Sequence, residues 1–269
     1  MEPVYAPGME QMETTSGSSS GGPRLVERAL DVLTALSEGP RALTVVAQEV
    51  GLSKATVHRI LAGLAYRDFV MQSPQTGEYM LGAGSLRLSR RITDANGGLV
   101  ALVSPTLSRL RDETGETVVM HARLGRRRVC LAEFESPHPL RYTVGVGADA
   151  PLHVGGAGKV LIAWLPESEL TQVLPPDLEA LTDFTITSWD VLHAELADVR
   201  AQGWAESHGE RVVGAFALSA PVFSSDGNVV AVASILGPEA RLSHARAVEL
   251  RLALLRASRE ASKAMGASA

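Results

Sequence analysis

The residue types that most often carry enzymatic chemistry are present in this sequence but are not arranged for it. The seven histidines are scattered, without an H-E-x-x-H motif or a pair four residues apart, so we predict no metal site. The single cysteine, Cys130, cannot form an internal disulfide, and its apolar neighbours favour a buried thiol. Glu206, His208 and Glu210 alternate along a predicted strand, but no nucleophile lies near them in the sequence. We therefore predict no catalytic residue and no cofactor.

A glycine-rich segment at 155–159 is the second pattern that could bind a ligand. A phosphate-binding P-loop would need glycine at 153 and serine or threonine at 160, where the sequence has His153 and Val160. The segment therefore does not indicate nucleotide hydrolysis. We predict instead that it opens a helix whose first amides, having no partner within the helix, can face an anion. Lys159 is either a ligand contact or part of a structural ion pair.

The clearest chemical pattern lies between residues 53 and 67. Ser53 can cap a helix whose apolar stripe includes Val57, Ile60 and Leu61, and this stripe must face inward. The side chains left facing outward or at the edges are then those of Lys54, Ala55, Thr56, His58 and Arg59.

Small residues near the start of a helix permit close approach to a duplex, and an arginine can form two hydrogen bonds with a guanine or contact a phosphate. We therefore predict that this helix binds DNA, with Ser53 at its start and Arg67, after its end, contacting phosphate. Two alternatives remain at this point: these are ordinary solvated residues, or the module binds another protein.

The elements around this helix form a recognisable module. Apolar residues at helical spacing predict helices over 25–36 and 44–50, with Gly51 ending the second. Two short β-like runs at 69–71 and 79–81 flank a glycine-containing turn. Three helices and a hairpin make a winged helix-turn-helix, which we place at 24–85, after a disordered leader at 1–23.

A linker helix at 86–98 is predicted to end in a chain break at Asn96-Gly97-Gly98, before a further helix over 99–113. The C-terminal domain, 99–269, then shows strand patterns at 117–124, 128–135, 140–145, 212–223 and 228–236. Helices are predicted at 156–165, 188–202 and 243–265. Strands joined by tight turns favour an antiparallel sheet, so the fold class is α+β.

Charge is divided along the chain. The 269 residues carry a net charge of −5, but residues 24–94 hold nine basic against seven acidic residues. A small basic module on an acidic body suits a protein of which one part meets phosphate. The sequence shows no basic-then-apolar signal segment and no apolar run of membrane-spanning length, so we expect a cytoplasmic protein without a membrane partner.

Several segments together resemble the IclR family of transcriptional regulators. The resemblance is carried by 25–33 and 50–61 in the first half and by 151–161, 203–214 and 220–223 in the second, in the family's order. Asp68 departs from the family, where glycine is usual, and so does Gly155-Gly156, where Thr-Ala is commoner.

The resemblance implies a GAF-like C-terminal domain that binds a small organic or aromatic acid and also mediates oligomerisation. The effector-binding positions it implies are Gly155, Gly156, Glu210, Arg211 and Ser234, to which we add Met120 as a candidate for an apolar wall. Leu236, where some relatives have a small polar residue, suggests a more apolar ligand. The apolar residues Val118, Leu131 and Val144 are candidates for the walls, although each also fits a plain core.

The resemblance also implies a homodimer, often paired into a dimer of dimers, on a pseudo-palindromic DNA operator. The expected function is ligand-responsive control of transcription, with repression or activation left open. Two other classes remain as alternatives. One is an enzyme that converts a small molecule and dimerises through its N-terminal module, and the other is a constitutive architectural DNA-binding protein.

Overall fold

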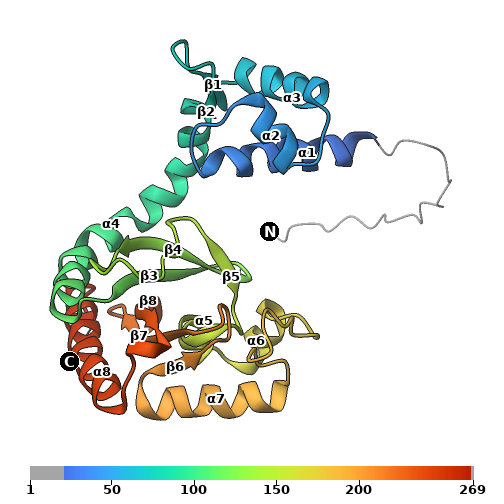
Figure 1. Cartoon of the computed structure of the whole chain (residues 1–269). Helices are drawn as coiled ribbons and strands as arrows, with labels where there is room; N and C mark the ends of the chain where they lie inside the picture. The colour runs from blue at the N-terminus through green and yellow to red at the C-terminus, as the bar shows by residue number, and fades with distance from the viewer. Residues whose placement is uncertain (1–20, 268–269) are drawn as a thin grey trace, which may run out of the picture. The chain divides into compact units, whose positions relative to one another are not determined.

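The computed structural model describes residues 21–267 and divides the chain into two compact units, the first ending at Thr93 and the second beginning at Asp94. The first unit contains three helices, α1 (Gly21–Ser37), α2 (Leu43–Glu49) and α3 (Lys54–Tyr66), and a two-stranded antiparallel sheet of β1 (Val70–Gln72) and β2 (Tyr79–Leu81) (Figure 1). The predicted winged helix-turn-helix is confirmed.

The predicted leader at 1–23 lies mostly outside the described residues, but its last three residues are helical. Helix α1 begins at Gly21, three residues before the predicted start of the winged helix-turn-helix at residue 24. The Gly, Ser, Pro and Met content of residues 1–23, together with the lack of an apolar period, predicted disorder up to Pro23. A proline in the first turn of a helix is tolerated, however, because the amide it lacks would have no partner there.

The first unit has its own core. Apolar side chains from the three helices and β1 pack together, as the helical spacing predicted, with Val57 and Leu61 of α3 fully buried. Gly51 has a φ of +63° at the turn between α2 and α3, a conformation that favours glycine. Gly77, with a φ of +72°, does the same in the loop of the β1–β2 hairpin.

Helix α4 (Ala83–Thr114) runs without interruption through the predicted break at 96–98, so that prediction is wrong. An added Cβ at Gly97 or Gly98 would meet nothing within 4 Å, so no close packing requires glycine at either position. Glycine inside a helix costs about 1 kcal/mol relative to alanine, which weakens a helix without ending it when long flanking segments are helical.

The second unit is built on a six-stranded antiparallel sheet, in the order β5-β4-β3-β8-β7-β6. Its strands are β3 (Thr117–Leu124), β4 (Arg127–Phe134), β5 (Asp149–Pro151), β6 (Ala205–His208), β7 (Ala215–Phe223) and β8 (Val229–Pro238). Its helices are α5 (Gly155–Ile162), α6 (Glu167–Val173), α7 (Trp189–Gln202) and α8 (His244–Ala264), with a short 3-10 turn η1 (Glu239–Arg241) before α8. The predicted α+β class is confirmed.

The strand predicted at 140–145 does not form, and β5 takes the edge position beside β4 instead. Two amides of the predicted strand, those of Val144 and Gly145, donate to the carboxylate of Glu133 at 2.7 and 2.8 Å. These bonds satisfy the backbone without a partner strand, and the positive φ of Gly145 and Gly147 bends the chain away from extended geometry. Helix α6 is a further element that the sequence pattern did not predict.

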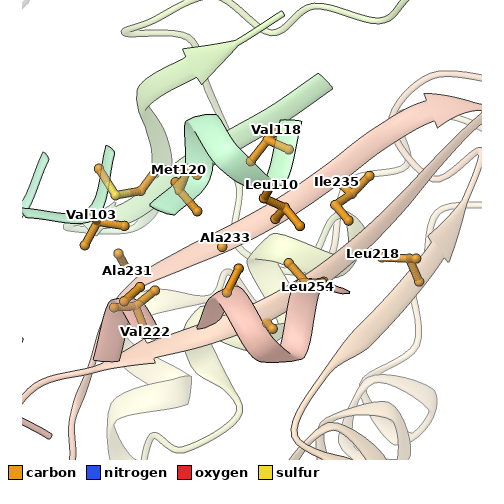
Figure 2. Packing of buried hydrophobic residues seen from close by; sticks show 14 of the residues in the cluster. Val103, Leu110, Val118, Met120, Leu218, Val222, Ala231, Ala233, Ile235 and Leu254 are labelled. Carbon is orange, nitrogen blue, oxygen red and sulfur yellow. The ribbon is translucent and has the colours of Figure 1, made fainter. Parts of the chain in front are cut away.

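The sheet is covered on both faces. One face packs against α4 and α8 through a cluster that includes Val103, Leu110, Met120 and Leu254 (Figure 2). The other packs against α5 and α7 through a second cluster that includes Val160 and Leu192. No helix in the part of the chain that the structure describes is long and apolar enough to span a bilayer.

Candidate functional site

Helix α3 presents a small, basic face to solvent. Lys54, Ala55, His58 and Arg59 are all exposed, as predicted from the inward stripe. Neither Lys54 nor Arg59 forms an ion pair with another residue that the structure describes. Ala62 and Gly63 extend this face by one turn, and we did not single them out from the sequence although both are small and follow the same helical spacing.

Ser53 and Thr56 hydrogen-bond to each other at the start of α3. The Ser53 hydroxyl accepts from the Thr56 amide at 3.2 Å and also lies 2.9 Å from the Thr56 hydroxyl. Thr56 is half-buried rather than fully outward, so its first role in this structure is to complete the cap. Arg67 is exposed just after the helix, with its guanidinium 5.9 Å from the centre of the Tyr66 ring.

The second unit contains a cavity of about 70 Å³ between the sheet and the start of α5. By the same measure one water needs roughly 10–15 Å³, so the cavity is large enough for about five waters or a compact ligand. Its walls come from β3, β4, β6, β7, β8, α5 and the loops at 142–144 and 210–212. The lining residues are His121, Arg128, Tyr142, Thr143, Val144, Gly155, Gly156, Ala157, Ser207, Glu210, Arg211, Val212, Ala215, Phe216, Ala217 and Leu236.

The glycines of α5 allow close packing. Gly155 has a φ of +73°, and a Cβ at Gly156 would lie 2.9 Å from the Ser219 hydroxyl of β7. A Cβ at Gly158 would lie 2.3 Å from the Leu152 carbonyl oxygen. The glycine-rich run is therefore needed to bring this helix against the sheet.

The first amides of α5 already have partners elsewhere in the protein, which corrects the prediction that they are free to face an anionic ligand. The Gly155 amide donates to the Glu210 carboxylate at 2.8 Å, and the Gly156 amide donates to the Ser207 hydroxyl at 3.0 Å. These side chains cap the helix from within the protein. An anionic ligand in the cavity must be bound by other groups.

Glu210 is held by a buried ion pair. Its second carboxylate oxygen accepts from the Lys159 ammonium at 2.8 Å, and Lys159 also pairs with Glu195 at 2.9 Å. Lys159 is 1% exposed, so of the two roles predicted for it the structure supports the ion pair. Glu210 lines the cavity, yet both of its oxygens are already hydrogen-bonded.

Two cationic side chains line the cavity without such partners. Arg128, on β4, is 6% exposed, and its only side-chain hydrogen bond with a described residue is from Nη1 to Nε2 of His121, at 3.2 Å. Its Nε has no partner, and neither has Nδ1 of His121. Arg211, on the loop after β6, forms no ion pair with a described residue.

Burial lowers the pKa values of both Arg128 and its hydrogen-bond partner His121. Burial, followed by the positive charge of Arg211, lowers the pKa of Arg128 to about 10, so Arg128 remains charged at neutral pH. Burial also lowers the pKa of His121 well below its usual 6.5, and the charges of Arg128 and Arg211 act in the same direction. Since arginine only donates, the neutral His121 accepts at Nε2 and carries its proton on Nδ1.

Of the six effector-binding positions, the structure brings four to the cavity: Gly155, Gly156, Glu210 and Arg211. Met120 lies on the opposite face of the sheet, in the cluster with α4 and α8 (Figure 2), so its assignment to the cavity is wrong. Ser234 is fully buried and hydrogen-bonds Ser219 at 2.8 Å without lining the cavity.

Among the predicted wall residues, Val144 and Leu236 line the cavity. Val118 and Leu131 instead pack in or against the cluster on the other face of the sheet. Cys130 is 1% exposed, as expected, and burial raises the pKa of its thiol to about 12. Within residues 21–267, no group of three or more His, Cys, Asp or Glu side chains is placed to hold a metal ion.

The sequence interpretation missed Arg128 and His121. The signal that could have identified them is their position in strands whose other residues are mostly apolar. In a strand covered on both faces a charged or polar side chain away from the strand end can be buried, as Arg128 is beside the exposed Arg127 at the start of β4, and a buried polar group needs a partner.

Two family models match the chain. Residues 25–74 match the IclR helix-turn-helix domain, and residues 95–263 match the bacterial transcriptional regulator IclR C-terminal domain. The chain belongs to the IclR family. The second model alone spans more than half of the chain, over the unit that holds the cavity.

Curated and solved relatives agree with this assignment. The HTH-type transcriptional regulator BhcR of Paracoccus denitrificans is 34% identical over 249 residues, covering 91% of this chain and 88% of its own. The transcriptional repressor IclR of Escherichia coli is 29% identical over 98% of each chain. The crystal structure of an IclR transcriptional regulator from Alicyclobacillus acidocaldarius has a TM-score of 0.71 and 29% identity, covering 93% of this chain and 100% of that one.

The IclR-family chain is therefore a transcriptional regulator with a DNA-binding helix-turn-helix domain and a C-terminal effector-binding domain. Since its relatives are named regulators and repressors, it is a regulator rather than an enzyme.

Proposed function

We propose that this regulator binds a pseudo-palindromic operator as a homodimer, through α3, and that a small organic or aromatic acid in the cavity changes its operator affinity. The observation that carries the DNA half is the exposed face of α3, where Lys54 and Arg59 flank Ala55 and lack ion pairs with described residues. Helix-turn-helix proteins place such a face in the major groove. In this proposal Ser53, Thr56, His58 and Arg67 contact the backbone or the edges of the groove.

The dimer proposal is supported by an apolar face of α1 that the described residues, 21–267, leave uncovered. Leu25, Val26 and Leu30 are 50%, 60% and 57% exposed, although leucine and valine at helical spacing normally face a core. A second copy of the chain would cover them, and further pairing would give a dimer of dimers. In this proposal the assembly acts in the bacterial cytoplasm, where its operator DNA lies.

The effector would act through helix α4, which contains residues of both units. An acid that binds more tightly to one arrangement of α4 than to another would shift the population toward that arrangement. Operator affinity would then change by the ratio of the two ligand affinities.

The test is a gel-shift titration at fixed salt with DNA from upstream of the protein's own gene. Substituting Arg59→Ala should weaken operator binding by about 1–3 kcal/mol, or roughly 5- to 150-fold, because one arginine contact with the DNA is lost. The control is Arg259→Ala, which removes an exposed arginine from α8. Unchanged affinity in Arg59→Ala, with the wild-type helix content, would refute the assignment of α3.

A further inference from the structure

The cavity holds a buried positive charge without a matching negative charge at hydrogen-bond distance. Arg128 is 6% exposed, and its side chain bonds only to neutral His121 among the described residues. Glu210 is the one carboxylate among the residues that line the cavity, but its two oxygens accept from the Gly155 amide and from Lys159. A buried, unpaired guanidinium is costly, so this arrangement favours an incoming anion.

Unused donors accompany this charge. Arg128 Nε and His121 Nδ1 are both buried without a hydrogen-bond partner. Nη2 of Arg128 lies 3.6 Å from the position of a Cβ added to Gly155, so the guanidinium reaches the start of α5. Arg211 lines the same cavity and adds a second positive charge. Together the three side chains offer donors and charge that suit a planar, two-oxygen acceptor.

The remaining walls limit the rest of the ligand. Val144, Ala157, Phe216, Ala217 and Leu236 present apolar surface, and the cavity measures about 70 Å³. These walls suit a short apolar body better than a phosphate ester or a sugar, whose hydroxyls would lack partners there.

We infer that Arg128, with His121, is the seat for the carboxylate of the effector, and that the effector is a compact monocarboxylate of roughly two to four carbons. Arg211 provides a second contact from the loop after β6, and the apolar walls enclose the carbon chain. This inference rests on the proposed effector role of the cavity and assigns the anion to Arg128 instead of to the α5 amides.

The experiment measures binding of sodium butyrate to the full-length protein by calorimetry, with butyramide as the uncharged analogue and sodium chloride at equal ionic strength. Wild type should bind butyrate, and butyramide should bind at least tenfold more weakly because it lacks the charge. Arg128→Met should weaken butyrate binding about 30-fold or more, since it removes one partner of a buried charge pair.

The matched control is Arg127→Met. Arg127 is the neighbouring residue on β4, is exposed and pairs with Asp149, so its loss should leave butyrate affinity unchanged. Without ligand, Arg128→Met should melt at or above the wild-type temperature, because it removes an unpaired buried charge. A structural role for Arg128 alone would lower the melting temperature.

Three results would overturn the inference: wild-type butyrate affinity in Arg128→Met, equal affinity for butyramide, or displacement of butyrate by chloride at equal concentration. If Arg128→Met does not fold, Arg128→Lys takes its place. Lysine retains the charge but lacks the forked donors, so at least tenfold weaker binding is expected and unchanged binding would refute the seat.

The same samples separate this inference from the proposed function. Operator binding by unliganded wild type tests the DNA half independently of any carboxylate. Butyrate binding without a change in operator affinity would leave the seat standing and refute the coupling. Operator binding without butyrate binding would refute the seat alone.

Discussion

Two buried pairs of side chains in the second unit differ in whether their charges are matched. Arg128 and His121 form one buried pair, in which the arginine holds the charge and the histidine stays neutral. Lys159 and Glu210 form another, in which both charges are matched. The first pair lines the cavity and has an unmatched charge and two unpaired buried nitrogen atoms, whereas the charge of Lys159 is already matched by carboxylates, which is why we assign the ligand to the first.

The neutral state of His121 makes stability depend on pH. Because the folded state holds the pKa of His121 well below 6.5, the unfolded chain binds one more proton below that pH. Stability should therefore fall as the pH drops below about 6.5, by up to about 1.4 kcal/mol per pH unit. Thermal melts between pH 7.5 and 5 check this.

The matched variant is His121→Gln, whose carbonyl oxygen can still accept from Arg128 but cannot titrate. Its melting temperature should depend less on pH than that of wild type over the same range. Equal slopes in the two proteins would mean that His121 does not titrate differently in the folded and unfolded states.

Residue-level prediction succeeded on α3 and failed on β3 for a physical reason. On α3 only one face is covered, so apolar spacing alone identifies the exposed Lys54 and Arg59. Strand β3 is covered on both faces, so apolar residues lie on each, and the pattern does not reveal which face holds the cavity. Met120 was therefore assigned to the wrong face and His121 was overlooked.

Among the elements, α4 is a case in which residues of low helix propensity are helical because the segments on both sides of them are helical. Asn96-Gly97-Gly98 predicts a break, yet the structure continues the helix through it and through Pro105. These positions leave the helix intact but weak near the point where the two units meet along the chain. The strand predicted at 140–145 fails for the opposite reason, because there the pattern predicts an element that does not form. The amides of Val144 and Gly145 donate to the side chain of Glu133 instead of to a neighbouring strand, and a pattern of apolar residues cannot predict these hydrogen bonds.

Replacing Gly97 and Gly98 with alanine tests this view of α4. Neither added Cβ meets another atom within 4 Å, so each substitution should stabilise the helix by up to about 1 kcal/mol. Urea unfolding followed by circular dichroism measures the gain. If α4 also transmits the ligand signal, the stiffer variant should show a smaller effector-induced change in operator affinity.

A destabilised double variant would show that the glycines are required by packing, contrary to the open space around them. Gly156→Ala is the contrasting substitution. Its Cβ would lie 2.9 Å from the Ser219 hydroxyl, so it should destabilise the protein.

At the scale of the whole molecule, the described residues leave apolar surface on α1 uncovered, and in our proposal a second copy of the chain covers it. Leu30 on α1 is 57% exposed, and Leu25 and Val26 are exposed beside it on the same helix. Substituting Leu30→Glu should dissociate the dimer, because a carboxylate would be buried in the interface. Light scattering at matched concentrations should report about half the wild-type mass.

The control is Val191→Glu on α7, which is 51% exposed and should leave the mass unchanged. Loss of the dimer should also weaken operator binding, since two linked α3 helices bind two half-sites together. A dimer that survives Leu30→Glu would place the interface elsewhere.

The most direct test of the whole mechanism is one titration of operator DNA with wild type and Arg128→Met, with and without saturating butyrate. A carboxylate bound at Arg128 should change the wild-type operator Kd by about fivefold or more and should leave the Kd of Arg128→Met unchanged. An operator Kd that does not respond to butyrate in wild type, or that responds equally in both proteins, would contradict control of DNA binding from this cavity.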